Sequence, residues 1–224
     1  MRAITGLASA QNRATIDLRG QELKRILLVR ANFRIGNAIL TLPAIAAFRK
    51  NYPAAQIDYV GSRISRLLFV NQPLDRHYET PRRFPQVLWQ YFILLRHLRA
   101  NQYDLALDIS CSQSGLASFI IGLSGARIRA GCVGNWDGLF NFRVDRLREA
   151  NKYRKLTELL TVLTLQSVDA VGELNFSTAE LSAGGDALAR AVGKVSRPLV
   201  GVFLGGRKLR GKRWPLENFV EVIA

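Results

Sequence analysis

The feature that most constrains the fold is a repeated alternation of short apolar runs with longer segments of helical periodicity. The runs at 25–31 and 103–110 have the length and composition of buried strands. The segment 85–101 repeats apolar residues three and four positions apart, as an amphipathic helix does. Such alternation is typical of a parallel sheet covered by helices on both faces. The sequence therefore predicts an α/β, Rossmann-like fold.

The same alternation supplies the remaining expected elements. Further strands are predicted at 56–62 and 126–131, and helices at 63–70, 115–125 and 151–165. Pro43 is awkward inside a helix, so the helix after the first strand either kinks or starts late, with Thr41 as its N-cap. Trp89, Tyr91 and Phe92 have helical spacing, and we expect them to form a buried face, not a platform that stacks on bases.

The domain organisation follows from these elements. Residues 1–24 are an N-terminal extension, 25–170 a Rossmann-like domain and 171–197 a linker with a weakly patterned helix. Within 198–224 we predict a strand at 198–206, a basic loop and a final helix. A lone strand and helix cannot bury their apolar faces. We therefore expect this last segment to be the truncated beginning of a second α/β domain.

Composition narrows the class of protein. The longest apolar stretches, at 67–70 and 119–123, are far shorter than the roughly 20 residues needed to span a bilayer. The N-terminal segment has no continuous apolar run, so no secretory signal is predicted and cytoplasmic residence is expected. Cys111 and Cys132 form neither a disulfide framework nor a Cys-x-x-Cys pair, and His77 and His97 stand twenty residues apart without nearby cysteines. We expect neither a metal nor a cofactor.

The charge indicates an anionic partner. The chain has 32 basic and 17 acidic residues, a net charge of +15, which is typical of proteins that meet nucleic acid, phospholipid headgroups or phosphorylated substrates. The basic residues form two clusters, one of arginines within 61–100 and one within 207–213. A nucleic-acid binder is supported by charge alone, so no specific nucleic-acid partner is expected.

The second cluster lies in "GRKLRGKR", 206–213, which nearly satisfies the P-loop pattern. Arg213 stands where the pattern needs a hydroxyl, so we do not predict a P-loop hydrolase. Backbone amides of a glycine loop before a helix still suit a phosphate, and a solvated basic loop is the alternative. The candidate phosphate-binding residues are Gly205, Gly206, Arg207, Lys208 and Lys212.

Four stretches together carry a resemblance to a known family. They are an apolar first strand, then "RIGNAILTLPAIAAFRKNYPAAQIDYVGS", "YDLALDIS" and "LGGRKLRGKRWPLENF". In this order they resemble glycosyltransferase family 9, the lipopolysaccharide heptosyltransferases, from about residue 25 to the end of the chain. The resemblance implies the two-domain GT-B arrangement, with an acceptor-binding N-terminal domain and a C-terminal domain that binds a nucleotide-sugar donor, typically ADP-heptose. It also implies inverting transfer without a metal, and it places Lys212 against the donor diphosphate.

The resemblance raises a question at Gly36-Asn37. Family members generally carry Gly-Asp after the first strand, and that aspartate is the proposed base, which must take the acceptor hydroxyl's proton. Asn37 can orient a hydroxyl but has no useful basicity. Three interpretations stay open: another carboxylate serves, reaction proceeds slowly through water, or the protein binds without catalysis. Asp108, at the predicted end of its strand, is the candidate substitute, and a loop-fixing or capping aspartate is the alternative.

Candidate acceptor-binding residues also lie at predicted strand ends. Arg34 and Gly36 precede Asn37, while Arg63 and Arg66 follow the second strand. Arginine forks suit phosphate or carboxylate groups, although a solvated basic surface is the alternative for each one. The leading hypothesis is heptose transfer to an anionic, lipid-linked lipopolysaccharide acceptor, with peripheral contact at the inner face of the inner membrane. The alternative is a catalytically silent relative that binds such an acceptor.

Overall fold

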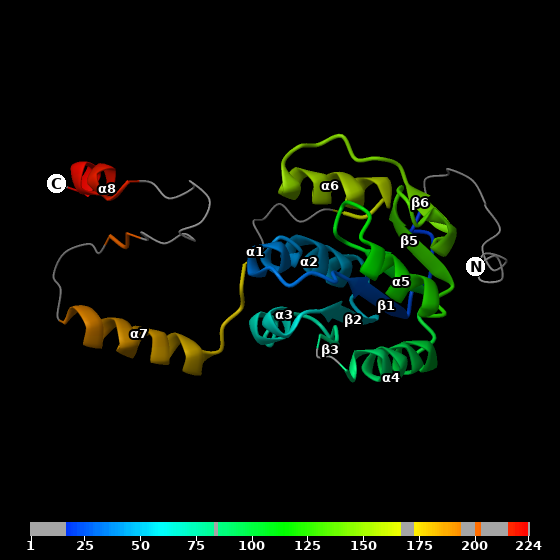
Figure 1. Cartoon of the computed structure of the whole chain (residues 1–224), viewed down its shortest axis with the longest axis horizontal. Helices are drawn as coiled ribbons and strands as arrows, with labels where there is room; N and C mark the ends of the chain where they lie inside the picture. The colour runs from blue at the N-terminus through cyan, green and yellow to red at the C-terminus, as the bar shows by residue number, and fades with distance from the viewer. Residues whose placement is uncertain (1–16, 83–84, 167–172, 194–199, 203–214, 224) are drawn as a thin grey trace. The chain divides into compact units, whose positions relative to one another are not determined.

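The computed structural model describes residues 17–82, 85–166, 173–193, 200–202 and 215–223. The chain divides into two compact units, Met1–Phe176 and Ser177–Ala224. The first unit contains a six-stranded sheet in which all neighbouring strands are parallel, in the order β3-β2-β1-β4-β5-β6 (Figure 1). Its strands are β1 (Arg25–Val29), β2 (Gln56–Gly61), β3 (Arg76–Glu79), β4 (Leu105–Asp108), β5 (Ile128–Cys132) and β6 (Phe142–Val144).

Helices follow most of the strands in sequence. In the first unit they are α1 (Ile35–Ile39), α2 (Leu42–Asn51), α3 (Arg63–Leu68), α4 (Val87–Ala100), α5 (Gly115–Leu123), the 3-10 turn η2 (Asp137–Leu139) and α6 (Lys152–Val162). The second unit contains α7 (Thr178–Val192) and α8 (Leu216–Ile223). The predicted α/β fold with a parallel sheet is confirmed.

The strand order reverses between β1 and β4. The chain builds β2 and β3 outward on one side of β1, then returns to place β4, β5 and β6 on the other side. The register sets Ile26 beside Leu105 and Val29 beside Asp108. The connections leaving β1 and β4 therefore diverge at the carboxyl edge of the sheet, which is the place where such folds bind ligands.

Alternate residues of the buried strands point to opposite faces of the sheet and pack into two apolar clusters. Ile26 and Leu28 of β1 pack into one cluster with residues of α2 and α6, while Leu27 and Val29 pack into the other with residues of α4 and α5. Both faces of the sheet are thus covered by helices (Figure 1). Burying a side chain of this size contributes about 1.5–3 kcal/mol, so these strands hold the sheet edge rigidly in place.

The helix after β1 starts late, as one of the two predicted alternatives requires. The short α1 ends at Ile39, and α2 begins at Leu42 with Thr41 as N-cap and Pro43 in its first turn. The Thr41 hydroxyl donates to the carbonyl of Ala38 over 2.7 Å and does not cap α2 itself. Pro43 is tolerated because the first turn of a helix needs no donor from it.

Two strands and one helix face differ from the prediction. The strands β3 and β6 were not predicted. The sequence of β3, Arg-His-Tyr-Glu, has no apolar run, because a strand at the edge of a sheet can form with half-buried polar residues. The expected burial of Trp89 and Phe92 was wrong, since these side chains are 64% and 56% exposed. Leu94 and Leu98 face the core instead. The helix is apolar around most of its circumference, so its periodicity could not identify the buried side.

The second unit contains the two helices that were predicted for it. The helix expected at the end of the chain is α8, whereas the predicted strand at 198–206 falls mostly outside the described residues, and 200–202 have no regular secondary structure. A helix in the expected linker is α7, which begins with a capping box between Ser177 and Glu180. Within the described residues, no helix is long and apolar enough to cross a lipid bilayer.

Candidate functional site

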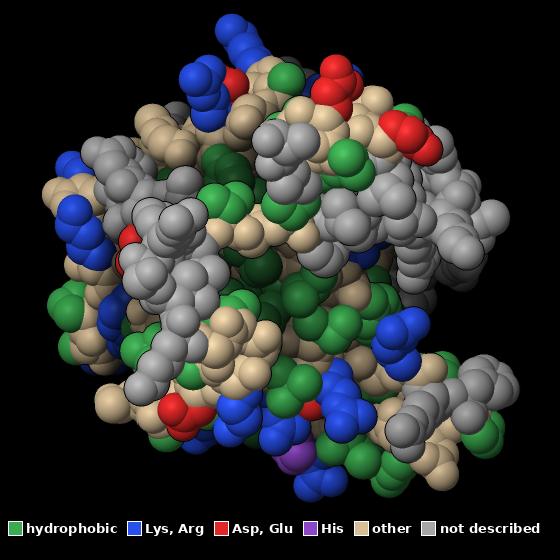
Figure 2. Space-filling view, turned by 90° about the vertical axis from the view of Figure 1, so that its left-hand side faces the viewer, with side chains coloured by type: hydrophobic (Ala, Val, Ile, Leu, Met, Phe, Trp, Pro, Cys, Tyr) green, Lys and Arg blue, Asp and Glu red, His purple; other side chains and the backbone are tan. Residues whose placement is uncertain are grey.

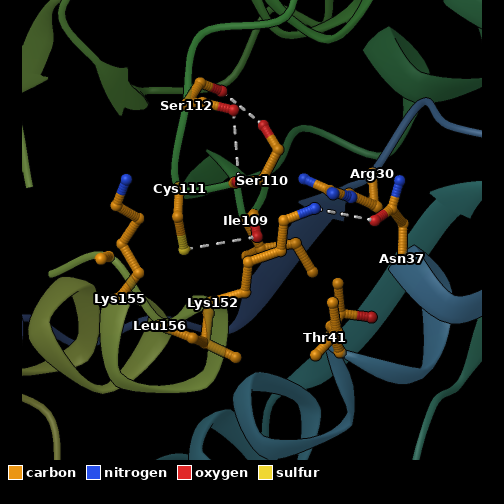
Figure 3. Close-up of a pocket in the computed structure, with 12 residues that line it drawn as sticks. Arg30, Asn37, Thr41, Ile109, Ser110, Cys111, Ser112, Lys152, Lys155 and Leu156 are labelled. Atoms are coloured by element: carbon orange, nitrogen blue, oxygen red, sulfur yellow. Dashed lines mark hydrogen bonds between the residues drawn. The ribbon is translucent and has the colours of Figure 1, made fainter.

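A pocket of about 150 Å³ lies where the chain leaves β1 and β4, at the reversal of the strand order. Its wall comes from the ends of these two strands, from α1 and from the start of α6 (Figure 3). We call it the switch-point pocket. It is lined by Arg30, Asn37, Leu40, Thr41, Ile109, Ser110, Cys111, Ser112, Ala150, Lys152, Lys155 and Leu156.

The polar lining consists of cations, hydroxyls and one amide, with no carboxylate among the lining residues. Arg30, Lys152 and Lys155 supply the positive charge. Arg30 is only 9% exposed, and its Nε has no hydrogen-bond partner within the described part of the chain. A buried guanidinium N–H without an acceptor costs stability, so this position suits an anion that enters the pocket.

Asn37 meets a cation across the pocket. Lys152 Nζ donates to Asn37 Oδ1 over 3.4 Å, and Figure 3 shows the lysine reaching from α6 to α1. Asn151 caps α6 by accepting from the backbone amides of Tyr153 and Arg154, which fixes the start of the helix. With one lone pair of its amide oxygen engaged by Lys152, Asn37 can still offer a ligand its two N–H donors and the second lone pair of that oxygen.

Asp108 is the last residue of β4 but does not line the pocket. Its side chain is buried, and Oδ1 accepts from the backbone amide of Ser110 over 2.9 Å and also from the Ser110 hydroxyl. Burial raises the pKa of Asp108 to about 6, while the hydrogen bonds of Ser110 and the charge of Arg30 oppose this rise. These contacts have the geometry of the loop-fixing alternative. Ser110 does line the pocket and links it to the carboxylate.

Two of the three predicted acceptor-binding arginines lie in a second, larger pocket. Arg63 and Arg66 line an open cavity of about 960 Å³ at the ends of β2 and β3, on the same edge of the sheet as the switch-point pocket. Arg66 forms an exposed ion pair with Glu79 at 3.0 Å, which contributes little to stability. The Arg82 guanidinium, also in this lining, lies 4.2 Å from the centre of the Phe33 ring. Figure 2 shows basic side chains (blue) gathered in the lower part of one face of the protein.

The other predicted residues lie apart from both pockets or outside the described residues. Arg34 and Gly36 are exposed at the start of α1 and belong to neither lining. A Cβ added at Gly36 would meet no atom within 4 Å. The predicted phosphate-binding residues Gly205, Gly206, Arg207, Lys208 and Lys212 lie outside the described residues.

The sequence interpretation missed three cationic residues of the switch-point pocket. Arg30 directly follows the buried run of β1, so the rule that strand ends face the site could have identified it. Lys152 and Lys155 are three positions apart, which places them on one helix face. Nothing in the sequence shows that this face returns to the end of β1.

Known proteins share both the sequence pattern and the fold. A family model described as glycosyltransferase family 9 (heptosyltransferase) matches residues 91–224. The Escherichia coli lipopolysaccharide heptosyltransferase 3 is 28% identical over 98 residues, which cover 42% of this chain and 28% of that protein.

Two solved structures show the same fold at low sequence identity. A family 9 glycosyltransferase from Veillonella parvula superposes with a TM-score of 0.75 at 19% identity, covering 90% of this chain and 60% of its own. The Escherichia coli ADP-heptose lipopolysaccharide heptosyltransferase II gives a TM-score of 0.60 at 20% identity, covering 88% and 60%. The chain thus spans less than two thirds of each of these proteins. Since the family match covers more than half of the chain, the chain belongs to glycosyltransferase family 9, the heptosyltransferase family.

Proposed function

We propose that this chain is the acceptor-binding part, with the beginning of the donor-binding part, of a glycosyltransferase that moves a heptose or related sugar from a nucleotide diphosphate to an anionic, lipid-linked lipopolysaccharide acceptor. The membership in the heptosyltransferase family and the name of the ADP-heptose lipopolysaccharide heptosyltransferase with the same fold support the donor and acceptor classes. Since such an acceptor lies in the inner membrane, we propose that the reaction occurs at the inner face of that membrane. The protein would be cytoplasmic and would bind the membrane peripherally.

The observation that carries this proposal is the cationic lining of the switch-point pocket beside Asn37. Arg30, Lys152 and Lys155 present donors and positive charge with no carboxylate among the lining residues. A phosphate or carboxylate of the acceptor would satisfy the buried Nε of Arg30. The acceptor hydroxyl would then lie near Asn37, at the position of the family's base.

The proposed reaction is an inverting displacement. The acceptor oxygen attacks the anomeric carbon and forms the new glycosidic bond while the bond to the diphosphate oxygen breaks, and the nucleoside diphosphate leaves with that electron pair. The hydroxyl proton must pass to a base. Since Asn37 cannot take it, we assign it to Asp108 by way of the Ser110 hydroxyl, which contacts both the carboxylate and the pocket. A pKa of about 6 makes this carboxylate a stronger base than an exposed one.

The remaining groups have roles consistent with the family resemblance. Arg63 and Arg66 in the second pocket would hold a further acidic group of the acceptor, and Arg34 and Gly36 would contact the acceptor at the start of α1. Gly205, Gly206, Arg207, Lys208 and Lys212 would hold the donor diphosphate. No metal has a role in this proposal.

The second candidate function is binding of the same acceptor without transfer. One observation favours it: an amide, itself bonded to Lys152, occupies the position of the base. Nucleotide release by the full-length protein, measured with ADP-heptose and an acidic lipopolysaccharide-core acceptor, separates the two functions. The transferase releases nucleotide only when both substrates are present. Tight acceptor binding with no release above the donor-only background would establish the silent binder.

The proton path has its own test. Asp108→Asn and Ser110→Ala should each lower the rate of nucleotide release by about 100-fold, the lower part of the range for a general base, with little change in acceptor affinity. Ser124→Ala is the matched control, because Ser124 is buried and, among the described residues, its hydroxyl bonds only within the end of α5 and the turn after it. An unchanged rate in Asp108→Asn would exclude Asp108 as the base.

A further inference from the structure

The outer face of α4 carries a contiguous apolar patch. Leu88, Trp89, Phe92 and Ile93 are 78%, 64%, 56% and 38% exposed. The rings of Trp89 and Phe92 stack with centroids 5.3 Å apart and planes inclined by 21°. We call these four residues the α4 patch. Single exposed apolar residues are normal, but a cluster with stacked aromatic rings indicates an interaction surface.

Among the described residues of the first unit, nothing covers the α4 patch, whose four side chains are all exposed. The opposite side of the helix, through Leu94 and Leu98, packs on the sheet and thereby fixes the direction of the patch. In Figure 1, α4 forms the lower margin of this unit. The patch is therefore held outward by the fold and is not an exposed loop that could collapse onto the protein.

The charge beside the patch has one sign. The exposed face of α4 continues beyond Ile93 with Arg96, His97 and Arg99, all of them exposed. Between Thr80 and Tyr103 the sequence contains no aspartate or glutamate. Apolar and aromatic residues thus occupy the first half of the exposed face, and basic residues occupy the second half.

We infer that the α4 patch and the adjoining arginines form a docking surface for an anionic lipid bilayer. Aromatic side chains prefer the boundary between headgroups and acyl chains, and arginines at the same depth meet lipid phosphates. Each basic residue near an anionic surface contributes about 1 kcal/mol of attraction. The α4 helix would lie along the membrane, with Trp89 and Phe92 inserted and Arg96 and Arg99 on phosphates. This inference rests on the proposed function only for the identity of the membrane.

A bilayer suits this surface better than a second copy of the chain. A symmetric dimer through α4 would place the same arginines against each other on chains that each carry a net charge of +15. A nucleic acid would gain from the arginines, but the most exposed residue of the α4 patch, Leu88, would gain nothing from a phosphate backbone. An anionic bilayer satisfies the charged half and the apolar half together.

The test is sedimentation of the full-length protein with phosphatidylcholine vesicles, with and without phosphatidylglycerol. Wild-type protein should bind the vesicles that contain phosphatidylglycerol and bind pure phosphatidylcholine much more weakly. Trp89→Ser/Phe92→Ser should reduce the partition coefficient at least about tenfold, because apolar surface no longer leaves water. Arg96→Gln should reduce it about fivefold, and less at high salt.

Phe119→Ser is the matched control, because Phe119 is an aromatic residue 43% exposed on α5. It should bind vesicles like the wild type, with circular dichroism confirming that all variants are folded. Equal vesicle binding by Trp89→Ser/Phe92→Ser and wild type would overturn the inference. A change in the sedimentation mass of the double variant without lipid would also overturn it, because that change would identify a protein interface. Preferential binding of the wild type to DNA over the anionic vesicles would overturn it as well.

Failure of this inference and failure of the proposed function give different results. Nucleotide release with a delipidated, water-soluble acceptor should be the same in Trp89→Ser/Phe92→Ser and wild type. Normal vesicle binding without any nucleotide release would overturn the transferase and leave the docking surface intact. Release without vesicle binding would overturn the docking surface alone.

Discussion

Lys152 donates from Nζ to Oδ1 of Asn37 over 3.4 Å and joins the start of α6 to α1 across the switch-point pocket. The two residues are 115 positions apart in the sequence. The contact places a cation against the position where the family's base is expected. A carboxylate at that position would be held ionised by the ammonium group, whereas the amide only accepts a hydrogen bond from it.

Asn37→Asp should therefore increase transfer. The new carboxylate would pair with Lys152 and supply a base at the family's position, so nucleotide release by the full-length protein should increase about 10- to 100-fold. The change is measured as the initial rate of nucleotide release at saturating donor and acceptor. Asn32→Asp adds the same charge on the loop after β1, at a residue whose side chain bonds the amide of Arg34. Equal rates in Asn37→Asp and wild type would show that proton removal at position 37 does not limit transfer.

Removing positive charge from the switch-point pocket should weaken acceptor binding. Lys152→Gln and Lys155→Gln should each increase the KM for an acidic acceptor about fivefold, and Arg30→Gln by more, because Arg30 is buried in the pocket lining. The donor KM should not change.

Lys24→Gln serves as the matched control, since Lys24 pairs with Glu22 just before β1, at the opposite edge of the sheet. Salt should weaken acceptor binding to the wild type more than to Lys152→Gln. If Lys24→Gln and Lys152→Gln had the same acceptor KM, the pocket would not be the anion site.

The buried carboxylate of Asp108 should make stability depend on pH in an unusual direction. Burial raises the folded-state pKa from 3.8 to about 6, so between these values the folded protein binds more protons than the unfolded chain. The free energy of unfolding is therefore highest, with respect to this group, below about pH 4, and this stability is lost as the pH rises through about 6. The penalty at neutral pH is on the order of 2–3 kcal/mol.

Urea unfolding of wild type and Asp108→Asn at pH 4 and pH 7 isolates this contribution, because other titrating groups cancel in the difference. Relative to wild type, the variant should gain stability between pH 4 and pH 7, although it loses activity. A variant that instead loses relative stability over this range would show that the ionised carboxylate is stabilised in the fold. The rate of transfer by the wild type should also fall as the pH falls through about 6.

Two glycines near the site should respond in opposite ways to alanine. A Cβ at Gly61 would lie 2.5 Å from both Ser65 Oγ and Tyr59 Cε1, so Gly61→Ala should lower the free energy of unfolding by about 1–3 kcal/mol. Gly36→Ala meets no atom within 4 Å and lies in a helical turn, so it should keep or slightly increase stability. Thermal denaturation compares the stability of the two variants with that of the wild type. Gly36→Ala should still weaken acceptor binding, and unchanged acceptor affinity would remove Gly36 from the proposed site.

The sequence by itself determined the layered architecture. The runs that became β1 and β4 are almost continuously apolar, because a central parallel strand is buried on both faces. Thr41 and Pro43 likewise marked the start of α2, since local backbone rules operate within one turn. These signals are local, and no distant residue is needed to interpret them.

The tertiary structure alone decided which residues meet and which faces stay exposed. Asn37 could be identified from its place after β1, but Lys152 joins it only because β4 pairs with β1 and α6 returns over the same edge. On α4, a helix apolar around most of its circumference buries Leu98 and leaves Trp89 outward. Periodicity reports that a helix has apolar sides, while the position of the sheet decides which side loses its contact with water.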